Sequence, residues 1–292
     1  MDKLYFVKMV ASGNDFVIIE KPLPSNAGDL SNLAKEICER KYGIGADGLL
    51  VLEKSKIADF RMRIFNPDGS EAEMCGNGLR CAAFWTNYKS TYNKPQKPLK
   101  KIKVETKAGI LEARVNKNRV KIKMTEPKDF KMDINLNIGG EKYTVHHINT
   151  GVPHTILFVN NLKNTNVKGL GKIIRFHPRF LPQGTNVDFV EIKDRKNIIL
   201  RTYERGVEDE TLACGTGAVA SAIITMARLP CRTHAEYSVN VLTQSGEILK
   251  VYFERDKDRF KNVWLEGTAR MVFSGVYYRR EKSTRNSLQR KS

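Results

Sequence analysis

Met74-Cys75-Gly76-Asn77-Gly78 and Ala213-Cys214-Gly215-Thr216-Gly217 are nearly identical stretches, and an alanine-rich segment follows each of them. A glycine-rich turn that opens a helix directs several free backbone N–H groups at one point and favours negative charge there. A cysteine at that point is expected to have a lowered pKa and a populated thiolate. The two stretches therefore predict a pair of reactive thiols, one acting as an acid and the other as a base.

The chain of 292 residues repeats around these cysteines. Three further pairs of turns recur in the same order and at nearly the same separation as the cysteines. These pairs are Gly13-Asn14-Asp15-Phe16 with Gly151-Val152-Pro153-His154, Gly45-Ala46-Asp47 with Gly184-Thr185-Asn186, and Thr106-Lys107-Ala108-Gly109 with Thr243-Gln244-Ser245-Gly246. The period is far longer than that of solenoid repeats, so it indicates two domains of similar fold.

Short runs rich in β-branched and aromatic residues predict most of the regular structure to be strand. We expect strands at 4–9, 16–19, 60–65, 102–106, 119–124, 155–159, 187–192 and 198–203, and helices at 30–40, 78–88, 170–174 and 218–228. The segment 218–226 is apolar nearly all round, so it should be buried inside its domain. The predicted fold class is α+β, with two pseudo-symmetric strand-rich domains, each around a central helix, facing each other across an active-site cleft. Residues 89–100 are expected to form an exposed loop.

Composition narrows the possible functions. The net charge is +18, but the basic residues are dispersed and no basic motif is interleaved with aromatics, so we expect no nucleic-acid partner. No apolar run is long enough for a membrane span, and we expect a cytoplasmic protein without a membrane partner. The five cysteines do not suggest a disulfide framework, and their spacing does not suit a zinc site, so no metal is predicted.

Two thiols in separate halves suit some reactions better than others. A hydrolase would need a histidine base beside one cysteine, which leaves the second cysteine stretch unexplained. A redox dithiol usually brings its cysteines together in a Cys-x-x-Cys motif. A racemase or epimerase instead needs two acid–base groups on opposite faces of one carbon, and a pseudo-twofold pair of domains supplies them. The N–H groups after each cysteine would hold the substrate carboxylate, where charge develops as the α-proton leaves. No cofactor motif is visible.

A second set of residues suits substrate capture. Asn14, Asn66 and Asn186 each lie in a turn, where asparagine most often has a structural role. Glu204-Arg205 lies just before the second cysteine stretch, and an arginine there would bind a second carboxylate through two parallel hydrogen bonds.

Several of these stretches together resemble the diaminopimelate epimerases, cofactor-independent enzymes of lysine and peptidoglycan-precursor synthesis. The similar stretches are 13–16, 43–48, 65–70, 73–78, 185–189 and 203–217, within a resemblance that extends from Phe6 to about Tyr278. The run Tyr203-Glu204-Arg205-Gly206 together with both cysteine stretches makes the resemblance specific.

The resemblance implies a role for each candidate residue. Cys75 and Cys214 would be the two acid–base groups that convert L,L-2,6-diaminopimelate to the meso isomer. The substrate-binding positions would be Asn14, Asn66, Gly76, Asn77, Asn186, Glu204, Arg205, Gly215 and Thr216. His154 and Glu204 would tune the cysteine pKa values.

The family fold also implies domain boundaries. Residues 1–124 with about 270–280 would form the N-terminal domain and 125–269 the C-terminal domain. Residues 281–292 are charged, serine-rich and almost without apolar residues, so we expect a disordered basic tail there. The sequence does not define the oligomeric state, and a homodimer is the assembly we consider.

The chain departs from the family pattern at two positions. Val152 stands where many members have asparagine, so that a polar contact is missing or is supplied by Asn149, and Gly48 stands where some have glutamine. The nearest alternative family, the proline racemases and hydroxyproline epimerases, shares Cys214-Gly215-Thr216-Gly217 but tends to carry histidine at the position of Asn77. A related isomerase group of the same fold lacks the cysteine pair. From other classes, a binding module, a degenerate paralogue or a nucleic-acid-associated protein stay open.

Overall fold

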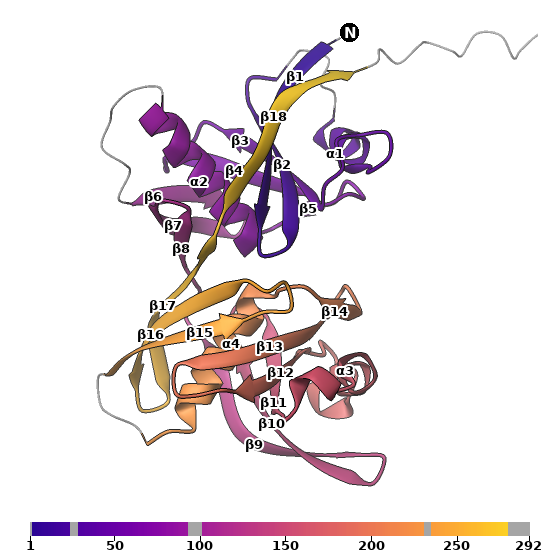
Figure 1. Cartoon of the computed structure of the whole chain (residues 1–292), viewed down its shortest axis with the longest axis vertical. Helices are drawn as coiled ribbons and strands as arrows, with labels where there is room; N and C mark the ends of the chain where they lie inside the picture. The colour runs from indigo at the N-terminus through magenta and orange to yellow at the C-terminus, as the bar shows by residue number, and fades with distance from the viewer. Residues whose placement is uncertain (1, 24–28, 93–100, 231–234, 280–292) are drawn as a thin grey trace, which may run out of the picture.

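The computed structural model describes residues 2–23, 29–92, 101–230 and 235–279. It consists of two halves stacked along the long axis (Figure 1). In the N-terminal half the strands pair in the order β1-β2-β3-β4-β6-β7-β8, with β5 at the end of β4. Their bounds are β1 Asp2–Ala11, β2 Asn14–Glu20, β3 Gly48–Glu53, β4 Phe60–Phe65, β5 Glu71–Ala72, β6 Ile102–Thr106, β7 Gly109–Asn116 and β8 Arg119–Lys123.

The C-terminal half repeats this order strand for strand. Its strands pair as β10-β11-β12-β13-β15-β16-β17, with β14 at the end of β13. The parallel pairs also recur, because β2–β3 and β4–β6 correspond to β11–β12 and β13–β15. The bounds are β10 Glu141–Asn149, β11 Pro153–Phe158, β12 Asn186–Ile192, β13 Asn197–Glu204, β14 Asp209–Thr211, β15 Ala235–Leu242, β16 Ile248–Asp256 and β17 Arg259–Thr268.

The last strand of each repeat crosses to the other half. β9 (Lys128–Ile138) follows β8 and pairs with β10, whereas β18 (Arg270–Arg279) follows β17 and pairs with β1. The crossing strands run past each other at the waist of the molecule (Figure 1). There, β8 and β17 pair directly, so one continuous ladder joins the two halves.

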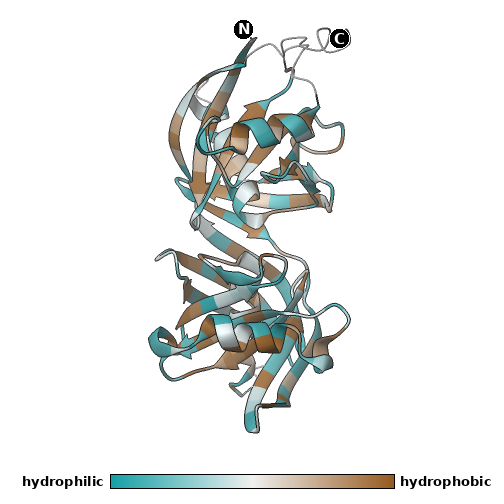
Figure 2. Cartoon of the chain, turned by 90° about the vertical axis from the view of Figure 1, so that its right-hand side faces the viewer, coloured by the Kyte–Doolittle hydropathy of each residue, from teal (hydrophilic) through white to brown (hydrophobic). Residues whose placement is uncertain are grey.

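Each half is built around one long helix, α2 (Gly76–Tyr92) or α4 (Gly215–Ala227). Ten residues of α4 from Gly217 to Met226 are buried, which confirms the prediction for its apolar surface. The largest apolar cluster contains buried side chains of both helices and of β8 and β17, so the core is continuous through the waist. The shorter helices α1 (Leu30–Cys38) and α3 (Val167–Arg175) pack over separate apolar clusters, one in each half. Brown and teal segments alternate along the ribbons of both halves in Figure 2. Two 3-10 turns, Leu162–Asn164 and Pro178–Phe180, flank α3.

The predicted fold class is confirmed, and some element bounds are wrong. Both central helices begin earlier than expected, at the glycine that follows each cysteine, because the glycine-rich turn is itself the first helical turn. α2 also continues to Tyr92, so the loop predicted from Lys89 is wrong for residues 89–92. The remainder of that loop (93–100) and the tail (281–292) lie outside the described residues.

Candidate active site

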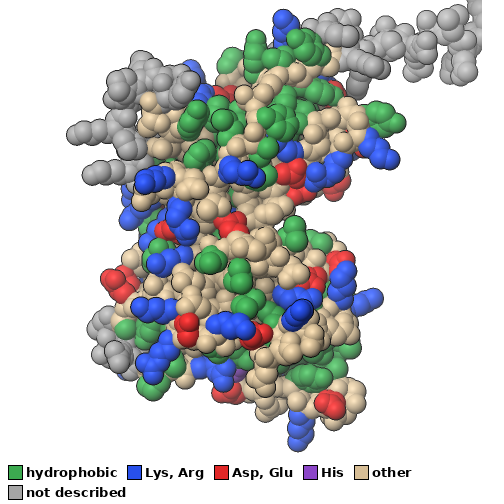
Figure 3. Space-filling model, in the orientation of Figure 1, with side chains coloured by type: hydrophobic (Ala, Val, Ile, Leu, Met, Phe, Trp, Pro, Cys, Tyr) green, Lys and Arg blue, Asp and Glu red, His purple; other side chains and the backbone are tan. Residues whose placement is uncertain are grey.

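The two central helices begin at the waist and extend away from it into opposite halves (Figure 1). A side chain at Gly76 would meet Ile122 of β8, and one at Gly215 would meet Leu265 of β17. Leu265 and Ile122 are direct register partners in the ladder that joins the halves. Paired residues of adjacent strands lie about 5 Å apart, so the two helix N-termini are placed side by side. The surface is hollowed between the halves on one side of this waist (Figure 3).

Cys75 immediately precedes α2, and the residue as a whole is of intermediate exposure. The Gly78 N–H donates to Cys75 Sγ at 3.5 Å. Burial raises the pKa of Cys75, while the N–H groups of Gly78 and Asn77 and the charge of Arg80 oppose that rise. The Glu204 carboxylate of the other half raises it further.

Cys214 is the N-cap residue of α4 and is buried. Its Sγ lies 3.4 Å from the Thr216 hydroxyl. Burial raises the pKa of Cys214 well above the ordinary thiol value, and the Glu204 and Asp188 carboxylates add to the rise. Glu204 therefore acts on both thiols, which places them in one electrostatic site.

The prediction of lowered cysteine pKa values is wrong for this structure. The N–H groups of the helix termini do favour the thiolate form, as expected. However, desolvation of a charge in a closed site outweighs them, and the nearby carboxylates act in the same direction as desolvation. The sequence motif shows the helix N-terminus but not how deeply the thiol is buried.

A polar chain connects His154 to Cys214. His154 is fully buried on β11; its Nδ1 lies 2.7 Å from Asp188 Oδ2 and its Nε2 lies 2.9 Å from Thr216 Oγ1. Asp188 also accepts a hydrogen bond from Thr202 at 2.7 Å. Burial raises the pKa of Glu204, so this carboxyl group is more easily protonated than an exposed one. The contacts therefore connect His154 to the Cys214 thiol through Thr216, while Glu204 acts on both thiols through its charge.

Asn14 and Asn77 lie together in the N-terminal half. The Asn77 carboxamide donates to Asn14 Oδ1 at 2.7 Å, and Asn14 donates to Asp47 at 3.0 Å. Asn77 in turn accepts from Arg80 at 2.8 Å. Both predicted substrate-binding asparagines are therefore held in fixed orientations.

Asn186 and Arg205 lie together in the C-terminal half. Asn186 Oδ1 accepts the backbone N–H of Arg205 at 2.8 Å, and its Nδ2 donates to Pro153 at 2.9 Å. The Arg205 guanidinium reaches the carbonyl of Gln183 at 3.3 Å. Asn66 is different, because its exposed carboxamide donates to Ser70 within its own turn.

Arg80, Asp188 and Asp47 belong to this network, although none of them was predicted as a site residue. Asp47 lay within the Gly45-Ala46-Asp47 repeat turn, so its correspondence with Asn186 was an available signal. Arg80 and Asp188 have no counterpart of the same charge in the other half, and only the structure shows where their charges lie.

The family comparison bears on the whole chain. A sequence model of the family described as diaminopimelate epimerase matches residues 6–129 and 146–272. The chain belongs to the diaminopimelate epimerase family. Among curated members, the diaminopimelate epimerase of Aquifex aeolicus is 40% identical over 281 residues, which covers 92% of this chain and 96% of that protein. The enzyme of Caldanaerobacter subterraneus is 43% identical, covering 92% and 98%, and that of Methanocella arvoryzae is 42% identical, covering 94% and 97%.

Solved structures of other families share the fold of this diaminopimelate epimerase family member. A phenazine biosynthesis protein of the PhzF family from Bacillus anthracis matches with a TM-score of 0.70 at 21% identity, covering 95% of this chain and all of that one. A hydroxyproline epimerase from Agrobacterium vitis matches with a TM-score of 0.66 at 15% identity, covering 94% and 92%. Both likenesses extend over the two halves and support the two-domain architecture.

The described residues contain neither a metal-binding cluster nor a helix suited to span a membrane. No cluster of three histidine, cysteine, aspartate or glutamate side chains is arranged to hold a metal ion within residues 2–23, 29–92, 101–230 and 235–279. In the same ranges, no helix is both long enough and apolar enough to cross a membrane.

Proposed function

We propose that this protein epimerises L,L-2,6-diaminopimelate to meso-diaminopimelate by two-base chemistry at Cys75 and Cys214, without a cofactor. The observation that carries the proposal is the meeting of the two helix N-termini over Ile122 and Leu265, with one cysteine at each. Two thiols on opposite sides of one site suit a reaction that removes a proton from one face of a carbon and delivers a proton to the other. We infer the substrate, diaminopimelate, from membership of the family.

The proposed chemistry uses groups already in place. One cysteine, as thiolate, takes the α-proton, and the other, as thiol, donates a proton to the opposite face. Backbone N–H groups at Gly76-Asn77 and at Gly215-Thr216 would hold the α-carboxylate, whose negative charge increases in the transition state. His154 and Glu204 would tune the thiols. The N–H groups at each helix N-terminus would therefore stabilise both the substrate carboxylate and the thiolate form of the cysteine.

The distal end of the substrate would be read by the remaining candidates. Arg205 would bind the second carboxylate, with Asn14, Asn66 and Asn186 contributing amide contacts. Asn149, suggested as a replacement for the family asparagine at Val152, accepts the Gly151 N–H at 3.0 Å. Its side chain therefore supports the turn at Gly151, which weakens this suggestion.

The deciding experiment is NMR of the reduced protein with L,L-diaminopimelate in D2O. Deuterium at the α-carbon of newly formed meso product supports the proposal. Exchange of proline or hydroxyproline instead would move the function to the racemase alternative. Cys75→Ala and Cys214→Ala should each abolish turnover of both isomers, while Cys38→Ala, which removes a buried thiol from α1, should not. Near-full turnover by either site variant would refute the two-base assignment.

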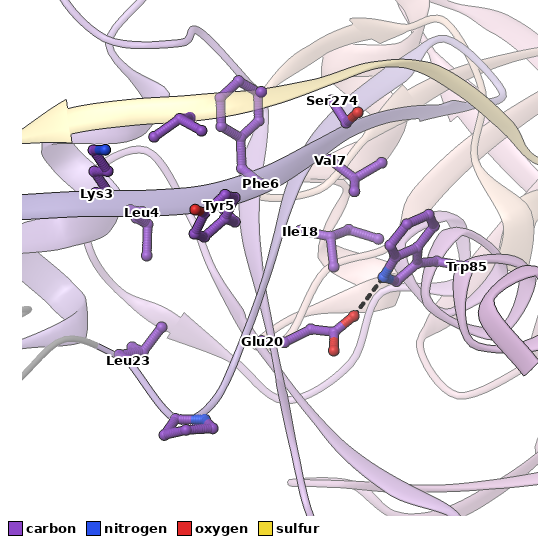
Figure 4. Close-up of a pocket in the computed structure, with 13 residues that line it drawn as sticks. Lys3, Leu4, Tyr5, Phe6, Val7, Ile18, Glu20, Leu23, Trp85 and Ser274 are labelled. Atoms are coloured by element: carbon purple, nitrogen blue, oxygen red, sulfur yellow. Dashed lines mark hydrogen bonds between the residues drawn. The ribbon is translucent and has the colours of Figure 1, made fainter. Parts of the chain in front are cut away.

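We also propose a homodimer formed through β18, with the enzyme acting in the cytoplasm, where free thiols stay reduced. β18 pairs only with β1 among the described residues, so its other edge is open. Met271, Val272 and Phe273 on β18 are all more than a third exposed, and Tyr5 of β1 is 72% exposed. A cavity of about 680 Å³ between β1, β18 and Trp85 of α2 adds apolar surface (Figure 4). An open edge beside an apolar face is typical of association.

Sedimentation velocity tests this assembly. Val272→Lys should shift the protein from dimer to monomer, whereas Ile173→Lys, which changes an equally exposed isoleucine on α3, should not. A monomeric wild-type protein at micromolar concentration would refute the dimer.

A further inference from the structure

The two halves share a fold, yet the charges buried beside their two thiols differ. Arg80 lies five positions after Cys75, and the equivalent residue five positions after Cys214 is Val219. Arg80 and Val219 are both fully buried. The N-terminal thiol thus has a buried cation on its helix, and the C-terminal thiol has an apolar residue in the same place.

A second difference has the opposite charge. Asp188 packs against Gly217 of α4, and Leu50 packs against Gly78, which holds the same position in α2. Both Asp188 and Leu50 are fully buried. The C-terminal thiol therefore lies near a buried anion that the N-terminal half replaces with a methyl-bearing side chain.

Arg80 is held at the junction of the halves, and within the described part of the chain it makes no direct ion pair to a carboxylate. Its Nη2 donates to Ser12 Oγ at 2.5 Å and to Asn77 Oδ1 at 2.8 Å. Ser12 hydrogen-bonds to Glu247 of the other half, whose charge also reaches the guanidinium. Among the described residues, Nε and Nη1 have no hydrogen-bond partner. The guanidinium lies against Gly267, where an added Cβ would be 3.0 Å from Nε.

A buried cation with two unpartnered donors is costly to the folded state, so stability alone does not account for it. Arg80 has no exposed surface and cannot bind substrate directly. What it does contact is Asn77, whose backbone follows the N-terminal thiol. What its charge acts on, besides Glu247 and the buried Cys81 thiol, is Cys75.

We propose that Arg80 is a positioning residue that orients Asn77 and makes Cys75 the resting thiolate, leaving Cys214 as the resting thiol. The groups facing Cys75 are Arg80 of its own helix and Glu204 of β13. Those facing Cys214 are Glu204 and Asp188, with His154 one hydroxyl away through Thr216. The shared Glu204 does not distinguish the thiols, whereas the unshared cation and anion both favour a proton on Cys214. This assignment rests on the proposed two-thiol function and adds a direction to it.

The pH dependence of alkylation by iodoacetamide, followed for each cysteine by peptide mass spectrometry, tests the proposal without substrate. The midpoint of the profile reports ionisation, and differences in accessibility change only its plateau. Cys75 should have the lower midpoint. Arg80→Met should raise that midpoint by about one pH unit, roughly a tenfold loss of thiolate below it, and leave the Cys214 midpoint unchanged. Arg80→Lys should retain most of the wild-type midpoint.

The matched control is Arg255→Met, which removes a buried arginine whose contacts are carbonyls at the end of α4. It should move neither midpoint.

With diaminopimelate, Arg80→Met should also raise KM, since Asn77 loses its anchor, and shift the acid limb of the kcat/KM profile to higher pH. If Arg80→Met does not fold by circular dichroism, Ser12→Ala, which removes one anchor, should shift the Cys75 midpoint in the same direction by less.

A lower midpoint for Cys214, or an unchanged Cys75 midpoint in a folded variant, would overturn the proposal. Failure of the wild-type protein to exchange deuterium into diaminopimelate, with the alkylation result as expected, would instead reject only the substrate.

Discussion

Adding one methyl group at equivalent glycines of the two cysteine stretches should give opposite results. A Cβ at Gly217 would lie 2.5 Å from Asp188 Oδ1 and 3.3 Å from the Cβ of Cys214. A Cβ at Gly78 would lie 3.1 Å from a methyl group of Leu50 and 3.4 Å from one of Ile64. Neither glycine has a positive φ, so the backbone accepts alanine at both positions.

The magnitudes follow from what the new methyl group meets. Alanine gains about 1 kcal/mol over glycine in a helix interior. At Gly217 the clash is about 1 Å inside contact distance; overpacking costs about 1–3 kcal/mol and disturbing a charged buried hydrogen bond costs about 1.5–3 kcal/mol. Gly217→Ala should therefore lower the free energy of unfolding by about 3 kcal/mol. At Gly78 the leucine methyl can rotate away, and Gly78→Ala should stay within about 1 kcal/mol of wild type.

Thermal and urea unfolding of both variants, with kcat measured in parallel, tests this reasoning. Displacement of Asp188 also disturbs His154 and Thr216, so Gly217→Ala should lose at least about tenfold in kcat while Gly78→Ala keeps most of it. Equal stability of the two variants would show that the Asp188 carboxylate is not fixed in place and would refute the argument.

Three further changes have defined outcomes. Burial alone would raise the pKa of Asp15, but Arg40 and Lys8 outweigh burial and lower the pKa from 3.8 to about 2. The resulting stabilisation of about 2 kcal/mol is present above pH 4 and is lost as the pH falls towards 2. Urea unfolding of Asp15→Asn at each pH should lack this pH-dependent contribution. Thr216→Val removes a hydroxyl that lowers the Cys214 pKa, so the alkylation midpoint of that thiol should rise and kcat fall about tenfold. Arg255→Met should cost about 3 kcal/mol of stability in urea unfolding, because carbonyls at the end of α4 lose their donor, with kcat unchanged.

The duplicated architecture was predictable because its signals are local. A Cys-Gly-x-Gly turn ahead of an alanine-rich segment is a helix start in either half, and the recurrence of turns at one separation indicates two similar domains. Strands whose residues do not alternate between apolar and polar, or that carry few apolar residues, were harder to predict. β3 is buried on both faces, so it lacks alternation, and the long β9 carries many polar residues on an exposed ribbon.

The electrostatics of the site could not be predicted, since they depend on contacts between halves. The sequence places Cys75 and Cys214 at helix N-termini, which favours thiolates. It does not show that Glu204 reaches both thiols, nor that desolvation outweighs the helix ends. The pairing of Ile122 with Leu265, which brings the helices together, is likewise a long-range register that no local pattern specifies.

A duplicated fold creates a problem that the charges of this protein address. Two identical, interacting thiols lose their protons in two steps, and between these steps the pair holds one proton. With perfect twofold symmetry, either cysteine would then be the thiolate with equal probability, so symmetry alone would set no resting direction for proton transfer. Arg80 stands where the other half has Val219, and Asp188 stands where the other half has Leu50. The cation beside Cys75 and the anion beside Cys214 both favour the proton on Cys214, and neither difference changes the repeated strand order. The strand order can therefore repeat closely while the chemistry of the two cysteines differs, because a buried charge acts strongly over the short distances at the waist.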